Sequence, residues 1–109
     1  MSVSACKPSF TLPEEIVRHF GLTIEADSSF DDQNGYYRLI LSGNTCPKEA
    51  EIIRKIKEYF SQYFDGQVAF RAEQPHSIAA ITDTDGYICN VTAISRHPCK
   101  IIITIVNQL

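Results

Sequence analysis

Apolar and polar residues alternate through most of residues 67–106, and a two-residue period of this kind predicts β-strands. Asp85-Gly86 lies between two of the alternating runs. An Asp-Gly pair favours a two-residue type I′ turn, because both central residues of that turn need a positive φ. Such a turn would place Ile78 opposite Ala93 and would gather the apolar residues of both strands on one face.

The polar segment over residues 94–98 ends in proline, which predicts a five-residue loop before the last strand. This loop would place Cys99 opposite Ala93 and Ile105 opposite Tyr87. Together with the run that begins at residue 67, the sequence predicts four successive antiparallel strands that share one apolar face.

Two other segments have the spacing of amphipathic helices. The first would begin with a capping box between Thr11 and Glu14, and would end after about nine residues at Gly21 in the left-handed conformation. The second covers residues 46–64, where the large apolar residues fall on one arc of the helix. Asp65-Gly66 would end this longer helix.

Residues 22–30 and 36–42 alternate like the later strands, and Asn34-Gly35 between them predicts a second hairpin. A two-residue turn there would place Ser28 opposite Leu41. The resulting order of elements is αββαββββ. The sequence thus predicts an α+β fold in which one short and one long helix pack on one face of an antiparallel sheet.

The chain has 109 residues, a net charge of −3 at pH 7 and 44% hydrophobic residues. This length suits a single α+β domain over residues 1–109, with residues 1–10 as a flexible or loosely packed N-terminal arm. The acidic balance argues against nucleic acid or an anionic membrane as the partner. Because the sequence has neither a signal-peptide core nor an apolar run of about 20 residues, a cytoplasmic location is expected.

The outward side of the predicted sheet is too apolar for a surface left in water. We expect it to bind a second copy of the chain, giving a homo-oligomer, or another protein partner. The plainer interpretation is that β-branched residues stand on exposed strands for their β-propensity alone. The residues predicted to form the partner-binding face are Tyr36, Arg38, Ile40, Arg71, Ile81, Ile88, Ile102 and Val106.

Cys46-Pro47 would open the long helix, and a thiol at a helix N-terminus has a lowered pKa because the helix dipole favours the thiolate. The pair resembles the CPxP site of small sulfur-carrier proteins, with Glu49 in place of the second proline. Cys46 is therefore the candidate catalytic residue of an alternative function. That alternative is a thiol-dependent enzyme or sulfur carrier, with His76 or His97 near the thiol.

Cys89 and Cys99, together with nearby histidines, invite a metal site or a Cys/His catalytic site. The predicted register separates the two cysteines by about 13 Å, which is too far for a disulfide or for a single metal ion. We expect reduced cysteines, no metal and no cofactor. Asp83 and Asp85, like the acids within residues 27–32, lack EF-hand spacing and are expected to be solvated turn acids.

These observations predict a small non-catalytic binding or assembly module. The segment ITDTDGYICNV, from Ile81 to Val91, also resembles the strand-turn-strand of PAS and related sensory domains. A ligand-sensing regulatory module, with a small-molecule pocket between helix and sheet, is therefore a further alternative.

Overall fold

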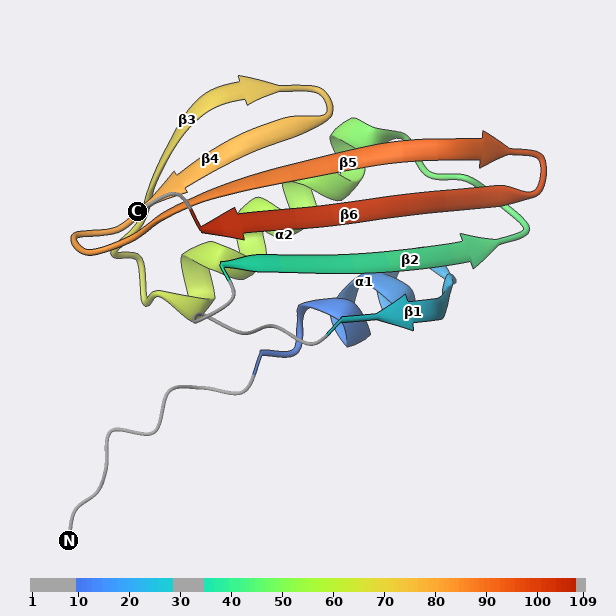
Figure 1. Ribbon diagram of the computed structural model, residues 1–109, viewed down its shortest axis with the longest axis horizontal. Coiled ribbons are helices and arrows are strands. Elements are labelled where there is room, and N and C mark those ends of the chain that lie inside the picture. The colour runs from blue at the N-terminus through green and yellow to red at the C-terminus, as the bar shows by residue number, and fades with distance from the viewer. Residues whose placement is uncertain (1–9, 29–34, 108–109) are drawn as a thin grey trace, which may run out of the picture.

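A computed structural model describes residues 10–28 and 35–107 of the chain. These residues form two helices and six strands in the order αββαββββ, which confirms the predicted α+β class (Figure 1). Residues 1–9 of the predicted N-terminal arm lie outside the described residues. The elements are α1 (Leu12–Phe20), β1 (Thr23–Asp27), β2 (Tyr36–Gly43), α2 (Glu49–Tyr63), β3 (Ala69–Gln74), β4 (Ser77–Ile81), β5 (Gly86–Arg96) and β6 (Cys99–Asn107).

All six strands belong to one antiparallel sheet with the order β1-β2-β6-β5-β4-β3. The last strand, β6, therefore inserts between β2 and β5 at the centre of the sheet. Both helices pack against the same face, so the domain has one layer of sheet and one of helices (Figure 1). No helix within residues 10–28 and 35–107 is long and apolar enough to cross a membrane.

The core lies between the helices and the face of the sheet that they cover, here called the covered face. Leu12 and Ile16 of α1 and Ile52, Ile56 and Phe60 of α2 are fully buried, as their helical spacing requires. The strands contribute alternate residues, because successive side chains of a strand point to opposite faces. Their buried residues on the covered face are Tyr37, Leu39, Leu41, Ile78, Ala80, Tyr87, Cys89, Val91, Cys99, Ile101, Ile103 and Ile105.

Helix α1 begins differently from the prediction, because Thr11 makes no side-chain cap. The predicted capping box with Glu14 is therefore wrong. The Thr11 hydroxyl donates instead to the Glu15 carboxylate over 3.2 Å, and the Thr11 backbone N–H donates to the Tyr59 hydroxyl over 2.8 Å. The neighbouring Phe10 packs its ring edge-on against Tyr59. Contacts with α2 thus fix the start of α1 where a local cap was expected.

Left-handed residues follow both helices, and the left-handed Gly21 after α1 confirms the prediction for the first helix. Gly21 follows α1 with a φ of 68°, and the N–H groups of Gly21 and Leu22 reach the Val17 carbonyl oxygen. Asp65 and Gly66 follow α2 with φ values of 53° and 75°. Glycine tolerates this conformation without a Cβ penalty, which explains its place at helix ends.

The predicted type I′ turn at Asp85-Gly86 is wrong. Residues 82–85 form a four-residue loop, and Gly86 is the first residue of β5, opposite Ile81, without a positive φ. Thr82 closes this loop from both sides: its N–H donates to the Asp85 carbonyl over 2.8 Å, and its hydroxyl oxygen accepts the Asp85 N–H over 2.9 Å. A threonine side chain therefore takes over the role assigned to glycine.

The connection between β5 and β6 is shorter than predicted. Only His97 and Pro98 connect Arg96 to Cys99, and their peptide bond is cis. Strand β5 has a β-bulge after Ala93, where the register with β6 shifts. The five-residue loop over residues 94–98 is thus replaced by extra strand, a bulge and a tight turn.

These connections change the strand register without changing the faces. Ile78 pairs with Cys89, where Ala93 was predicted, and Ala93 pairs with Ile101, where Cys99 was predicted. Both shifts are even, and an even shift keeps every side chain on its face. The predicted registers are wrong, but the predicted apolar face is confirmed.

The first hairpin differs in register as well. Ile24 lies opposite Leu41, where Ser28 was predicted, and β1 has a bulge between Ile24 and Ala26. Asn34 of the predicted turn lies outside the described residues. Strand β1 is consequently shorter than the predicted strand over residues 22–30, and it pairs further along β2.

Candidate functional site

The face of the sheet that points away from the helices, here called the open face, includes all eight residues predicted for the partner-binding face. Tyr36 pairs with Val106, and Val106 with Ile88, so these side chains form a row across β2, β6 and β5. Within the described residues, no helix or strand lies over this face (Figure 1). Its members are Tyr36, Arg38, Ile40, Ala69, Arg71, Ala79, Ile81, Ile88, Asn90, Thr92, Ile102, Thr104 and Val106.

The apolar side chains of the open face remain accessible to solvent. Tyr36 is 48% exposed and Ile81 is 39% exposed, whereas Ile40, Ile88 and the other apolar residues of the central strands are half-buried. Neighbouring strands shield part of each side chain, and the rest faces solvent. The apolar side chains form rows across the strands, such as Ile40 beside Ile102, and the row of Arg38, Thr104 and Asn90 between them is polar. Exposed apolar groups gathered on one face in this way are typical of an interaction site.

The open face carries no charge at the centre of its two middle strands, β6 and β5. The outward residues of β5 and the central outward residues of β6 are all uncharged. Arg38 lies on β2 and Arg71 on the outer strand β3, while Lys100 is the second residue of β6 and its Nζ lies 3.2 Å from the Glu25 carboxylate. Hydrogen bonds from Ser42 and Lys100 hold the pKa of the Glu25 carboxyl below its usual value. The open face thus has an uncharged centre and a mostly cationic rim.

The two outer edges of the sheet are irregular. Strand β1 has its bulge next to Ile24, and β3 loses regular pairing between Arg71 and Gln74, where Ala72 has a φ of 52°. Bulges on edge strands hinder pairing with strands of other molecules. The outer edges are therefore poor sites for association, and the open face is the larger regular surface.

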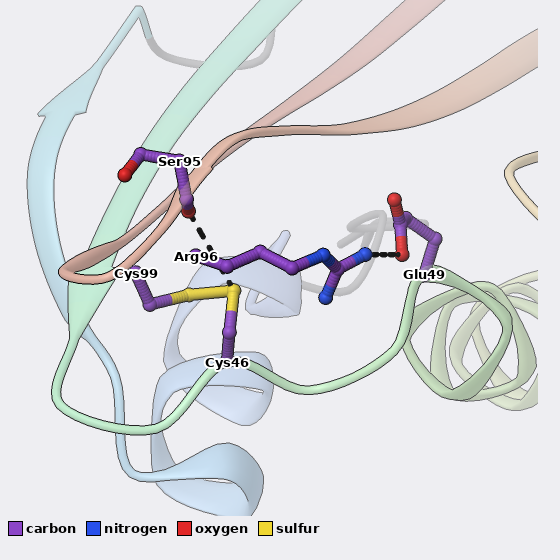
Figure 2. Close-up of a disulfide and its surroundings, with 5 residues drawn as sticks. All are labelled: Cys46, Glu49, Ser95, Arg96 and Cys99. Carbon is purple, nitrogen blue, oxygen red and sulfur yellow. Dashed lines mark hydrogen bonds and ion pairs between the residues drawn. A yellow bond between two sulfur atoms is a disulfide. The ribbon is translucent and has the colours of Figure 1, made fainter.

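Cys46 does not open α2. Helix α2 begins at Glu49, with Lys48 as its N-cap residue, so Cys46 and Pro47 precede the helix. Cys46 forms a disulfide with Cys99, with 5.0 Å between their Cα atoms, and its Sγ lies 3.8 Å from the Ser95 carbonyl oxygen (Figure 2). The predictions of a helix-activated thiol at Cys46 and of reduced Cys46 and Cys99 are therefore wrong.

Cys89 is the free cysteine among the described residues. It is fully buried on the covered face, and burial raises the pKa of its thiol to about 12 because the thiolate would lose its hydration. A thiol of this kind is protonated at neutral pH and hidden from reagents. Cys89 therefore packs as a small apolar side chain.

The histidines do not complete a catalytic pair with a thiol. His97 lies in the β5–β6 turn, two residues before the bonded Cys99, and His76 lies in the turn between β3 and β4. Tyr37 is buried on the covered face, where burial raises the pKa of its hydroxyl. No group of three or more metal-ligating side chains occurs within residues 10–28 and 35–107.

The acids of the predicted turns have local roles where the structure describes them. The Asp85 carboxylate accepts a hydrogen bond from the Thr84 hydroxyl over 3.0 Å, within the loop that Thr82 closes. Asp31 and Asp32 lie outside the described residues. Asp85 therefore stabilises the loop between β4 and β5.

The chain was compared with protein-family models, with curated proteins and with solved structures, and none of them matches. The part of the chain that the structure describes forms an α+β sheet with helices on one side and an open face on the other.

Proposed function

We propose that the protein is a non-catalytic binding or assembly module that self-associates through the open face. The observation that carries this proposal is the distribution of charge on that face. Interfaces between proteins have apolar centres with few charges and polar rims, and they are enriched in tyrosine and arginine. The open face has this arrangement, with Ile88 and Ile102 at the centre and Arg38 and Arg71 towards the rim.

The size of the open face also supports self-association. Strands lie about 4.8 Å apart and rise about 3.3 Å per residue, so one face of a sheet with the lengths of β1 to β6 covers roughly 700 Å². A specific interface buries about 800 Å² on each partner. A second copy would bring a face of the same size and composition, as a two-fold dimer requires.

The alternatives have less support. The thiol-dependent enzyme or sulfur carrier needs a free Cys46, which is bonded to Cys99. The ligand-sensing module needs an enclosed pocket between helix and sheet. The described side chains between the two layers pack as a core, and the groove between α2 and β5 lies at the margin of this core. The cytoplasmic location stays a prediction, and the disulfide weighs against it because such bonds persist mainly in oxidising compartments.

Two isoleucines with nearly equal exposure test the proposal. Ile81 lies on the open face and is 39% exposed, whereas Ile24 is 37% exposed and lies opposite Leu41 of the covered face. Ile81→Lys should shift the protein towards a monomer of 12.3 kDa at micromolar concentration. Ile24→Lys, the same chemical change at the sheet edge, should leave the oligomeric state as it is. Light scattering and sedimentation measure both.

A wild-type protein that stays monomeric throughout the micromolar range would exclude the proposal. So would a dimer that Ile24→Lys weakens as much as Ile81→Lys, because the contact would then lie on the other side of the sheet. A second substitution, Ile88→Lys, tests the centre of the open face and should act more strongly than Ile81→Lys at the rim.

A further inference from the structure

Strand β5 is much longer than its neighbour β4. The ladder between them ends at the pair Ser77 and Asn90, followed by one hydrogen bond from the Val91 N–H to the His76 carbonyl oxygen over 2.9 Å. Beyond this point, no described strand pairs with this side of β5 over residues 92–96, and Figure 1 shows β5 continuing past β4. Backbone amides alternate between the two sides of a strand, so the Ala93 N–H points to the same side as that of Val91. The sheet thus has an internal free edge, separate from its two outer edges.

A groove of about 630 Å³ follows this free edge. The first turn of α2 forms one wall, with Lys48 and Ala50, and the turn at Pro75-His76 forms the other. Val91 and Ala93 of β5 line it with small apolar side chains. A second groove of about 290 Å³ shares Ala50 and Pro75 with the first and continues along α2 to Lys57. The free edge therefore opens into two adjoining grooves, here together called the channel.

The channel is lined by more basic than acidic side chains. Its two acids are neutralised by ion pairs, Glu49 with Arg96 over 2.6 Å and Glu73 with Lys57 over 2.7 Å (Figure 2 shows the first pair). Lys48 and Arg54 also line the channel and have no ion pair within the described residues. A basic channel in a chain of net charge −3 is complementary to an acidic ligand.

We propose that this channel binds an extended acidic peptide segment of a partner protein, which adds as a strand to β5 over residues 92–96. The free edge supplies main-chain hydrogen bonds, as in other cases of strand addition, and Lys48 and Arg54 supply the preference for acidic side chains. The β5 bulge after Ala93 limits regular pairing to a few residues. Charge therefore contributes a large part of the affinity, and binding weakens as salt is added.

This site is independent of self-association, because it uses the edge of β5 and the start of α2 while the open face stays uncovered. The probe is a fluorescein-labelled hexapeptide of alternating glutamate and valine, and the control peptide alternates lysine and valine. Fluorescence anisotropy should show saturable binding of the acidic peptide to the full chain. The basic peptide should not bind.

Two double variants with the same change in charge localise the binding. Lys48→Glu with Arg54→Glu should weaken binding of the acidic peptide by about tenfold, since each reversal replaces an attraction with a repulsion. Arg38→Glu with Arg71→Glu alters the open face by the same total charge and should leave peptide binding close to that of the wild type. The same pair of variants should have the opposite ranking in the dimer assay.

Hydrogen exchange of the Ala93 amide reports strand addition directly. Bound peptide should slow exchange at this amide at least about tenfold, because a free edge amide becomes hydrogen-bonded. The proposal is overturned if the acidic peptide does not bind, if the basic peptide binds equally well, or if both double variants bind the acidic peptide alike. Binding that leaves Ala93 exchange unchanged also overturns it, because the peptide would then lie elsewhere.

Discussion

The two faces of the sheet have similar residues and different surroundings. Ile103 and Ile102 are neighbours on β6, yet Ile103 is fully buried beneath the helices while Ile102 on the open face is half-buried. β-Branched residues fit a pleated surface on either side of a sheet, so composition alone does not separate the two faces. The difference between them is the second layer, which among residues 10–28 and 35–107 covers only one face.

This difference separates stability from interaction. Apolar side chains stabilise a fold according to the surface that folding removes from water, and that surface is larger on the covered face. The apolar residues of the open face therefore stabilise the fold less than they would if they were fully buried. Self-association would bury the remaining surface and give them the role that the helices give to the covered face.

The largest expected effect concerns the disulfide that ties the covered face to the segment before α2. Cys99 begins β6, and Cys46 lies 53 residues away in sequence. A crosslink that closes a loop of this length stabilises by roughly 4 kcal/mol, mainly by restricting the unfolded chain. Cys46→Ala should therefore lower the free energy of unfolding by about this amount, as measured by urea denaturation without reductant.

Reductant provides the control for this variant. It should destabilise the wild type to the level of Cys46→Ala and should leave Cys46→Ala unchanged. Cys89→Ala keeps the disulfide, so this variant should respond to reductant like the wild type. A wild type with the same stability with and without reductant would show that the crosslink does not form in solution.

The next effect compares the two faces at adjacent residues. Ile103→Ala should cost about 3 kcal/mol, because it leaves a cavity in the core, whereas Ile102→Ala should cost about 1 kcal/mol or less. Urea denaturation at a protein concentration where the chain is monomeric measures both. Equal losses would mean that the open face is covered after all.

The dependence of stability on protein concentration gives a second comparison of Ile102→Ala with Ile103→Ala. If copies associate through the open face, the wild type gains stability as its concentration rises, by mass action. Ile102→Ala should reduce this dependence on concentration, and Ile103→Ala should lower stability at every concentration. A residue of the open face would then be identified by a weaker rise of stability with protein concentration. A residue of the covered face would be identified by the same loss of stability at every concentration.

The sequence predicted which residues share a face better than it predicted which residues pair. The apolar face follows from the two-residue period, and the period is unaffected when Ile78 pairs with Cys89 four residues away from the predicted partner. The turns depend on particular contacts. The hydroxyl of Thr82 closes the β4–β5 loop, and nothing in the Asp85-Gly86 pair signals that competition.

Among the candidate site residues, too, the positions that follow from strand alternation were predicted, and the contact that depends on the tertiary fold was not. All eight residues predicted for the partner-binding face lie on the open face, because their place follows from alternation, and their role in binding stays a proposal. The bond of Cys46 could not be predicted, because it depends on β6 inserting beside β2. In that arrangement Cys99 pairs with Gly43, which precedes Cys46 by three residues. Such long-range neighbours leave no local pattern in a single sequence.

Two glycines at the ends of elements give a smaller effect. A Cβ at Gly21 or at Gly86 would meet no atom within 4 Å, and the two residues differ in that only Gly21 has a positive φ. Gly21→Ala should cost about 1 kcal/mol, while Gly86→Ala should be neutral or stabilise by about 0.5 kcal/mol through the unfolded chain. Melting temperatures compare them. If Gly86→Ala lost as much stability as Gly21→Ala, Gly86 would have a positive φ, as the predicted type I′ turn requires.

The smallest effect concerns Glu49, at the boundary between the covered face and the free edge of β5. Its own backbone N–H and the Arg96 guanidinium hold the pKa of the Glu49 carboxyl below its usual value. The folded state therefore binds this proton more weakly than the unfolded state. The resulting stability is fully present above the usual glutamate pKa of about 4.3 and is lost as the pH falls through the lower pKa of the folded state.

Glu49→Gln removes this pH-dependent contribution. At pH 7 the variant should be less stable than the wild type by less than about 1 kcal/mol, because Arg96 is 48% exposed and solvent screens the pair. As the pH falls below the usual glutamate pKa of about 4.3, the difference should shrink, since protonation of the wild-type carboxyl removes its charge from the pair. The control is Glu51→Gln, in the same helical turn, where the described residues include no ion-pair partner for Glu51. If the wild type keeps its advantage over Glu49→Gln at low pH, the ion pair with Arg96 is not its source, and packing of the side chain at the start of α2 is.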